Sequence, residues 1–468
     1  MASGDTPQPS YALHPPSSPQ ILGAEARARV PYEFMAQHRH HANPPTLLLR
    51  ISRLLDTIEG GKLPQPAREA RLGVMRHAWP RLLRWYDWLC TTQAGAVQGT
   101  FRWRGRDPQD TRLNALTLSS GLDDFPRASV PNERERHVDL LCWVAFASRV
   151  LGRLANQLGM EGEGERLLNE HALQMKGLDK YHWNEEAGAY CDYGYHSNEG
   201  EFKLHYVVKC GSADNTESVM HAIPDPRRAG CPRTHPHFLF PLADGEGGLL
   251  TREVFSSRKL RLQWVEHLGY VALFPLLLRL LPPSSPRLPR LLELLRDPQR
   301  LWSPYGIRSL SLADIWHARE NAPGDQPYWR GPIWININYL ALGGLHYYAQ
   351  QPGQSRARAA VIYTELRDNL VSSPVDGALL SALHSPPTSP LGTPPLPPGR
   401  SLHLPLSIFP LAFLSPPLTP FWWFAGWQHA KAMAADWLLL GAVQRRNRGR
   451  TANAPLQRLV FSRAACYR

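Results

Sequence analysis

Apolar residues recur at helical spacing in five stretches in the middle of the chain. Their period of three to four residues is that of a helix with one buried face. The stretches predict helices over residues 68–89, 133–158, 263–281, 288–296 and 334–351. In the second stretch, Asn132 is a candidate N-cap, and Glu133 and Glu135 fall in the first turn, where acidic side chains favour the helix dipole. The pattern therefore predicts an all-α fold.

Long loops rich in Asp, Trp, Arg, Gly and Pro separate the predicted helices. Helical bundles usually have short connections, so this alternation favours a helical barrel or solenoid. Both ends differ in composition: residues 1–20 contain five prolines, and residues 371–420 contain 13 of the 44 prolines before a basic end. Since proline breaks helices and central strands, we expect a disordered start at 1–20, one domain over 21–370, and a mostly disordered tail at 371–468.

The net charge of +12 would suggest a nucleic acid or an anionic membrane surface as partner. The distribution of the charge along the chain argues against both partners. Residues 371–468 alone carry +7, from nine Lys and Arg against two Asp. The six cysteines lie at no zinc spacing, and no phosphate loop, HExxH or GxSxG motif is present. We therefore expect no metal, no cofactor and no nucleic acid. The start resembles no signal peptide, and no run of about 18 apolar residues predicts a membrane span.

The segment TLSSGLDDFPR, residues 117–127, places two adjacent carboxylates in a loop. Asp123 and Asp124 follow a glycine closely and precede a proline. Adjacent side chains cannot both face one point, so one is free for chemistry while the other can hold the loop. An Asx turn or a helix cap is the simpler explanation of the local pattern taken alone.

Aromatic and hydrogen-bonding residues that suit a sugar subsite gather in two further loops. YWRGPIWININY, residues 328–339, combines Trp for stacking on sugar rings with Arg and Asn for hydrogen bonds to hydroxyls. Its candidate residues are Tyr328, Trp329, Arg330, Trp334 and Asn338. WSPYGIRSL, residues 302–310, adds Trp302 and Tyr305 in an aromatic turn. The alternative is a buried aromatic helix start, since a large helical domain with 15 Trp buries many of them anyway.

Two acidic segments have simple structural explanations. WNEEAGAYCDY, residues 183–193, separates two Glu from Asp192 by a turn, as a β-hairpin would. In ERHVDLLCW, Glu135 and Asp139 are four residues apart and share a helix face. A surface ion pair with Arg136 would account for this second segment.

Taken in this order, these segments resemble the processing α-glucosidase I (mannosyl-oligosaccharide glucosidase) family over about residues 21–370. The resemblance begins with ILGAEARARVPYEF and HANPPTLLL and continues through RWRGRDP, SGLDDFPRAS and ERHVDLLCW. It then passes LGYVALFPLLLRLL, WSPYGIRSL and YWRGPIWININYLALGGLH. It implies an (α/α)₆ barrel as catalytic domain, and hydrolysis, with inversion, of the terminal α-1,2-linked glucose of the N-glycan precursor.

The resemblance also implies roles for particular residues. By motif match Asp123 is the general acid, while Asp124 and Arg127 support its loop. Because a nearby cation lowers the pKa of an acid and a general acid needs it raised, we expect Arg127 to point at Asp124 or at sugar hydroxyls. Glu135 and His137 fall in a motif associated with substrate binding. The glucose subsite would comprise Trp302, Tyr305, Tyr328, Trp329, Arg330, Trp334 and Asn338.

The implied partner is a glucosylated high-mannose N-glycan on a nascent glycoprotein, on the lumenal side of the endoplasmic reticulum membrane. The chain departs from the family pattern at both ends. The family's general base is a Glu in a Trp-Glu-Gln-Tyr motif, but residues 366–468 contain no Glu. We also expect the family's membrane anchor, β-sandwich domain and first barrel helices to be absent from these residues. We therefore expect an incomplete toroid with impaired catalysis, and no membrane contact from this segment itself.

Two alternatives stay open beside an impaired glucosidase. One is a catalytically inactive remnant that still binds glucosylated glycans, because binding needs the aromatic subsite but no base. The other is a nucleic-acid or membrane-surface binder that acts through the Arg-rich residues 445–450. Affinity that maps to this tail and collapses with salt would indicate the latter, although such clusters are often only solvated charge.

Overall fold

The computed structural model describes residues 40–108, 113–213, 218–224, 230–231, 233, 235–243, 248–321 and 325–372. All of them belong to the first of the two units into which the chain divides, Met1–Ser385. The predictions of disorder for residues 1–20 and for the tail beyond residue 372 fall outside these ranges, as does the Arg-rich segment.

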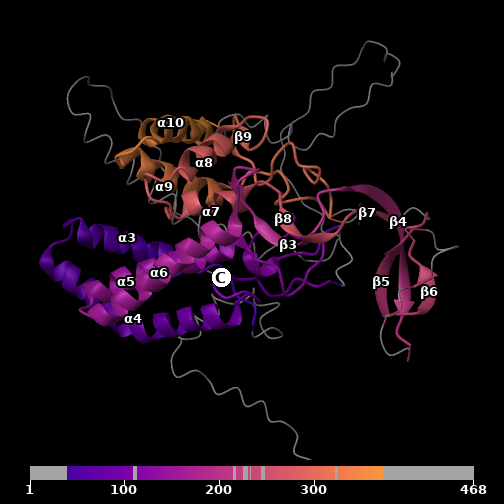
Figure 1. Cartoon of the computed structure of the whole chain (residues 1–468), viewed down its shortest axis with the longest axis horizontal. Helices are drawn as coiled ribbons and strands as arrows, with labels where there is room; N and C mark the ends of the chain where they lie inside the picture. The colour runs from indigo at the N-terminus through magenta and orange to yellow at the C-terminus, as the bar shows by residue number, and fades with distance from the viewer. Residues whose placement is uncertain are drawn as a thin grey trace, which may run out of the picture. The chain divides into compact units, whose positions relative to one another are not determined.

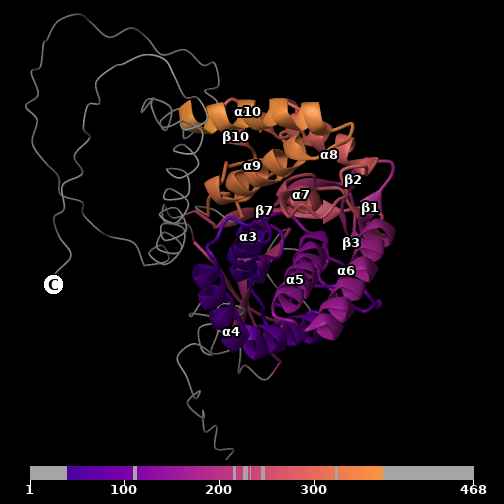
Figure 2. The ribbon, with the colours of Figure 1, turned by 90° about the vertical axis from the view of Figure 1, so that its left-hand side faces the viewer.

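Within the described ranges, eight α-helices and one short 3₁₀ helix make up most of the regular structure. They are α3 Leu47–Glu59, α4 Gln65–Thr92, η1 Leu118–Ser120, α5 Val138–Gln157, α6 Glu161–His182, α7 Tyr270–Leu277, α8 Arg287–Arg296, α9 Ile335–Gln350 and α10 Arg356–Ser372. In Figures 1 and 2, α3 to α6 lie together in one group and α7 to α10 in a second group next to it. Contacts between α5 and α7 join the two groups.

Helix α5 is the centre of the core. It packs against α3, α4, α6 and α7, and side chains all around it are buried, as expected for a helix enclosed by others. Trp143 illustrates this packing, because its ring meets Phe146 edge-on at 6.2 Å and Phe274 of α7 at 5.8 Å between ring centroids. The apolar core thus runs without a break through both helix groups.

Three predicted helices are confirmed. Residues 68–89 lie in α4, residues 288–296 in α8 and residues 334–351 almost entirely in α9. Pro80 is accommodated inside α4 without ending the helix.

Two helix predictions need correction. The helix expected over 133–158 begins only at Val138. Asn132 forms an Asx-type turn instead of a cap, since its Oδ1 accepts the backbone N–H of Arg134 at 2.8 Å. The stretch 263–281 is also only partly helical, because its first residues belong to a strand and α7 starts seven residues later.

The prediction of an all-α fold is wrong for residues 183–265 and for a small hairpin near residue 305. The strands are β1 Trp183–Asn184, β2 Ala189–Tyr190, β3 Asp192–His196, β4 Gly200–Gly211, β5 Ser218–Ile223, β6 His237–Pro241, β7 Thr251–Ser257, β8 Arg261–Val265, β9 Trp302–Ser303 and β10 Gly306–Ile307. Strand β4 is the centre of a four-stranded antiparallel sheet, paired with β5 and β6 along one half and with β7 along the other. The hairpin predicted over 183–193 is confirmed by the antiparallel pair β1 and β2.

A disulfide joins β4 to a neighbouring loop. It connects Cys210 and Cys231, whose Cα atoms are 5.9 Å apart. None of the helices described here is both long enough and apolar enough to cross a bilayer.

Candidate active site

A short 3₁₀ helix and a left-handed glycine present Asp123. The helix η1 ends at Gly121, whose φ of 72° turns the chain in a conformation that glycine adopts readily. The backbone N–H of Thr117 donates to the carbonyl of Asp123 at 2.8 Å and closes this turn. Asp123 is only 3% exposed, and Tyr328 Oη donates to its Oδ2 at 3.3 Å. Burial and the nearby carboxylates raise the pKa of Tyr328, so its hydroxyl stays protonated and serves as a donor.

Asp124 has different partners and ties this loop to residues 328–330. Its Oδ1 accepts the backbone N–H of Trp329 at 2.6 Å. Its Oδ2 accepts the backbone N–H of Tyr328 at 3.0 Å and Nδ2 of Asn321 at 3.2 Å. Burial raises the pKa of Asp124, although Arg330 and these N–H donors oppose the shift. The two aspartates thus have different partners, since Asp124 anchors the loop and Asp123 meets the Tyr328 hydroxyl, and their roles in chemistry stay predictions.

The guanidinium of Arg330 is buried behind this contact. Its Nε donates to the carbonyl of Asp124 at 2.8 Å, and its Nη1 donates to the carbonyl of Arg319 at 3.2 Å. Its plane also lies 5.4 Å from the ring centroid of Trp316. Burial lowers the pKa of Arg330, and Asp124 is the main group that opposes this shift. Arg330 therefore joins the backbone just after the candidate acid to the backbone at Arg319.

Two stacked tryptophans lie next to this junction. The rings of Trp329 and Trp334 are 4.1 Å apart and 10° from parallel. Trp334 Nε1 donates to the carbonyl of Tyr328, which fixes the outer ring relative to the loop. Trp329 is buried, whereas Trp334 is partly exposed. Trp334 is therefore the member of the pair that a ligand can reach.

The remaining predicted subsite residues lie around the β9–β10 hairpin. Trp302 is buried beneath the guanidinium of Arg296, and Tyr305 at the turn is partly exposed. Asn338 is fully buried, and its Oδ1 accepts the backbone N–H of Ile307 at 2.8 Å. Its Nδ2 donates to Tyr270 Oη at 3.0 Å. In this structure Asn338 thus fastens the hairpin to the start of α9.

Tyr270 connects this hairpin to the tryptophan pair. Its hydroxyl donates to the carbonyl of Ile307 at 2.7 Å and accepts the backbone N–H of Trp334 at 3.0 Å. The structure therefore links the Asp123 loop, residues 328–334 and the β9–β10 hairpin through one set of hydrogen bonds.

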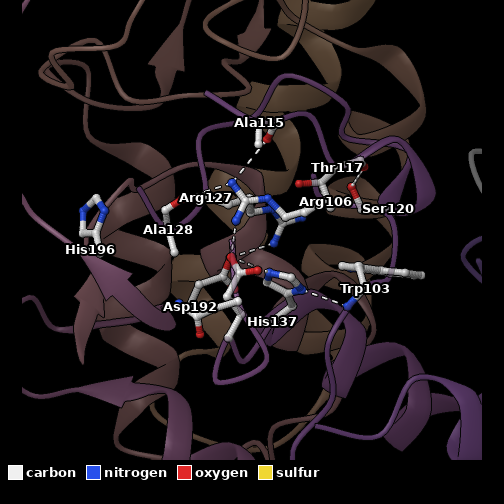
Figure 3. Close-up of polar contacts among 12 residues, drawn as sticks. Trp103, Arg106, Ala115, Thr117, Ser120, Arg127, Ala128, His137, Asp192 and His196 are labelled. Atoms are coloured by element: carbon white, nitrogen blue, oxygen red, sulfur yellow. Dashed lines mark hydrogen bonds and ion pairs between the residues drawn. The ribbon is translucent and has the colours of Figure 1, made fainter. Parts of the chain in front are cut away.

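The expected contact between Arg127 and Asp124 is wrong. Arg127 is fully buried, and its Nη1 and Nη2 donate to Asp139 at 2.9 and 2.8 Å. Its Nη1 also pairs with Asp192 Oδ2 at 2.8 Å, and Figure 3 shows the guanidinium above Asp192. The reason is burial, because a cation without exposure needs anionic partners in direct contact. Arg127 thus supports the loop from the interior and stays away from the candidate acid.

The expected surface ion pair of Glu135 with Arg136 is also wrong. Glu135 is fully buried, and its Oε1 pairs with Arg106 Nη1. The same oxygen lies 3.7 Å from His137 Nε2, and His137 Nδ1 accepts the backbone N–H of Trp103 at 2.9 Å. Burial acts to raise the pKa of Glu135, but Arg106 outweighs it and holds the pKa below its ordinary value. A substrate-binding role for Glu135 and His137 stays a prediction, since their contacts here are internal.

Sequence reasoning missed four members of this interior network. They are Trp103, Arg106, Asp139 as a partner of Arg127, and Asp192. Two of them lie in RWRGRDP, a segment used only for the family resemblance. A signal was available there, because with three arginines in this segment of seven residues, any arginine that becomes buried needs a carboxylate from elsewhere in the chain.

Three further carboxylates that could act as a second acid or base, Glu185, Glu186 and Glu266, lie at or next to the β1–β2 hairpin. Glu185 accepts a hydrogen bond from Trp183 Nε1 at 2.5 Å, and Glu266 accepts one from Asn184 Nδ2 at 3.0 Å. Glu186 donates its backbone N–H to Asn184 Oδ1 at 3.1 Å. These hydrogen bonds thus join residues of the hairpin to one another and to Glu266, which directly follows β8. Across the described ranges, no group of three or more His, Cys, Asp and Glu could hold a metal ion.

Comparison with known proteins identifies relatives of this chain. The mannosyl-oligosaccharide glucosidase GCS1 of Arabidopsis thaliana is 36% identical over 365 residues, which are 76% of this chain and 38% of the relative. Alpha-glucosidase 2 of the same plant is 35% identical over 366 residues, 76% of this chain and 41% of the relative. A probable mannosyl-oligosaccharide glucosidase of Schizosaccharomyces pombe is 34% identical over 390 residues, again 76% of this chain and 39% of the relative. The chain therefore spans about two fifths of the length of these relatives.

A solved structure and a family model complete the comparison. The GH63 mannosylglycerate hydrolase of Thermus thermophilus in complex with Tris aligns with 71% of this chain and 69% of that chain, at 15% identity and a TM-score of 0.40. The two chains therefore superimpose only loosely. The model of the glycosyl hydrolase family 63 C-terminal domain, in contrast, matches residues 17–376, more than three quarters of the chain. This chain is therefore a member of glycosyl hydrolase family 63 and contains its C-terminal domain.

Proposed function

We propose that this chain is an inverting exo-α-glucosidase of N-glycan processing that acts on the terminal α-1,2-linked glucose of the precursor. Relatives at 34 and 36% identity bear the name mannosyl-oligosaccharide glucosidase, which supports a glycan substrate. The observation that carries the proposal is the contact of Asp123 with Tyr328, beside the stacked pair Trp329 and Trp334. A carboxyl group next to an aromatic platform suits protonation of a glycosidic oxygen on a stacked sugar.

The proposal includes impaired turnover. An inverting glycosidase needs a second carboxyl group roughly 6.5–9.5 Å from the first to activate water. The last Glu of the chain is Glu365, and its Oε2 accepts Arg296 Nε at 2.6 Å. A chain that keeps the aromatic platform but lacks a carboxylate to activate water would bind glucosylated glycans and hydrolyse them poorly. A purely glycan-binding remnant is the alternative function.

We further propose that residues 21–370 form an incomplete (α/α)₆ toroid, with residues 1–20 and 371–468 outside the domain. Long loops between packed helices, which carry the Asp123 and Tyr328 segments, support this architecture. The proposed partner is a glucosylated high-mannose N-glycan on a nascent glycoprotein, on the lumenal side of the endoplasmic reticulum membrane. The disulfide between Cys210 and Cys231 supports an oxidising compartment.

Glucose release from a triglucosylated N-glycan tests the proposal, with glycan binding measured on the same folded sample. We expect binding with little release, and loss of any release by about 100-fold or more in Asp123→Asn. Trp334→Ala removes the accessible ring of the stacked pair and should weaken binding. Turnover equal to that of a full-length family member would contradict the impairment. A folded chain that neither binds nor hydrolyses the glycan would overturn the proposed function.

A further inference from the structure

The loop that carries Asp123 is closed at its base by one asparagine side chain. The backbone N–H of Arg127 donates to Asn114 Oδ1 at 3.4 Å, and Asn114 Nδ2 donates to the carbonyl of Arg127 at the same distance. Thirteen positions along the chain separate these two residues. Because both bonds use the same side chain, the two ends of the loop are held together like the ends of a hairpin.

Arg106 lies against this base and binds both ends of the loop at once. Its Nη2 donates to Asn114 Oδ1 at 3.1 Å and to the carbonyl of Ala115 at 3.3 Å on one side. On the other side it donates to the carbonyl of Ala128 at 3.0 Å. Figure 3 shows the guanidinium between Ala115 and Ala128. The planar fork of arginine presents several donors in a fixed arrangement, which the single ammonium group of lysine cannot reproduce.

One carboxylate holds Arg106 in this position. Glu135 Oε1 pairs with Arg106 Nη1, and neither side chain has any exposure. The other buried cation nearby, Arg127, is paired with Asp139 and Asp192. Glu135 therefore neutralises Arg106, while Asp139 and Asp192 neutralise Arg127.

The far side of the loop is fixed independently. Asp124, next to the candidate acid, accepts the backbone N–H groups of Tyr328 and Trp329. The base of the loop is thus clamped by Arg106 and its tip is tied through Asp124, and between these two supports Asp123 meets Tyr328 Oη. Rigid support of this kind holds a reacting group in productive geometry.

We propose that Arg106, held by Glu135, is a positioning residue that fixes the loop 114–128 so that Asp123 meets Tyr328. The proposal rests on the role proposed above for Asp123. It also assigns a structural role to Glu135 in the protein interior, since Glu135 acts on the loop through Arg106.

Hydrogen–deuterium exchange of the full chain tests the proposal. Arg106→Lys keeps a charge for Glu135 but loses the fork, so peptides covering 113–128 should exchange about tenfold faster. Peptides of α5 should exchange at the parent rate, which global destabilisation would not allow. The matched control is Arg149→Lys, because Arg149 is partly buried and donates through Nη2 to the carbonyl of Leu278 at 2.7 Å, away from this loop.

A second variant keeps the test decisive if Arg106→Lys does not fold. Glu135→Gln preserves the shape but removes the charge that holds Arg106, and should accelerate exchange of the loop about threefold. Unchanged loop exchange in a folded variant, or equal acceleration in α5 and the loop, overturns the positioning role. Glycan binding is measured on the same proteins. Failure of the parent chain to bind counts against the proposed function, while the exchange data decide the role of Arg106 by themselves.

Discussion

At the scale of single residues, the interior of this protein is organised by paired charges. Arg127 contacts two carboxylates, Asp139 and Asp192, and all three side chains are at most 4% exposed. Burying such a group is tolerable only because each charge has a partner. Removing one partner should therefore affect stability far more than removing a similar pair at the surface.

Replacing Arg127 by methionine tests this directly. The variant Arg127→Met leaves two buried carboxylates without their cation, and we expect the free energy of unfolding to fall by about 3–5 kcal/mol. The matched control is Arg166→Met on α6, whose exposed guanidinium pairs with Glu163 and Glu170. That change should alter stability by less than about 1 kcal/mol. Urea unfolding followed by tryptophan fluorescence measures both, and similar losses for the two variants would contradict the buried network.

Sequence patterns singled out Asp123 and Asp124, although the partners of both lie about 205 positions away along the chain. Adjacency predicts only that the two side chains diverge, and in the structure Asp123 meets Tyr328 Oη while Asp124 accepts the backbone N–H of Trp329. Their roles in chemistry stay predictions. The partners of Arg127 could not be predicted in this way, since Asp139 lies 12 and Asp192 lies 65 positions away. Pairing across such separations depends on how the helices and β3 pack, which a local motif does not encode.

At the scale of elements, helices with strong periodicity were predictable, whereas among the strands only the β1–β2 hairpin was predicted. The apolar period of α4, α8 and α9 is sufficient to place them. The strand signal in β4 was present, because polar and apolar residues alternate from Glu201 to Leu204. This alternation is short and lies in a chain with many helical stretches, so it did not indicate a strand by itself. The strand is stabilised by its pairing with β5, β6 and β7, which a local pattern does not show.

Two glycines of α6, two positions apart, test how tightly α5 and α6 pack. A Cβ on Gly164 would collide with the Asn156 side chain and come 3.2 Å from the carbonyl of Gly152, both on α5. We expect Gly164→Ala to destabilise the protein by about 1–3 kcal/mol. A Cβ on Gly162 would meet nothing within 4 Å, so Gly162→Ala should stabilise it by roughly 0.5 kcal/mol. Thermal unfolding compares the two, and a gain in both variants would show that the helices are less closely packed than described.

At the scale of the whole molecule, the surface of the four-stranded sheet is unusually apolar. Three consecutive residues of β6, Phe238, Leu239 and Phe240, are each more than 40% exposed. Alternate side chains of a strand point to opposite faces, so both faces of β6 carry exposed apolar groups. Strand β6 also lies at an edge of the sheet. Exposed apolar edge strands favour pairing with other chains.

A single charge placed on this strand should therefore reduce self-association of the protein. We expect Leu239→Lys to raise the concentration at which light scattering appears by about tenfold, because lysine on an edge strand opposes pairing with another edge. Its thermal stability should stay within about 0.5 kcal/mol of the parent, since Leu239 is 44% exposed. The control Leu173→Lys adds the same charge on α6, where the leucine is 65% exposed. If both variants improve solubility equally, net charge is responsible, and β6 has no special part in association.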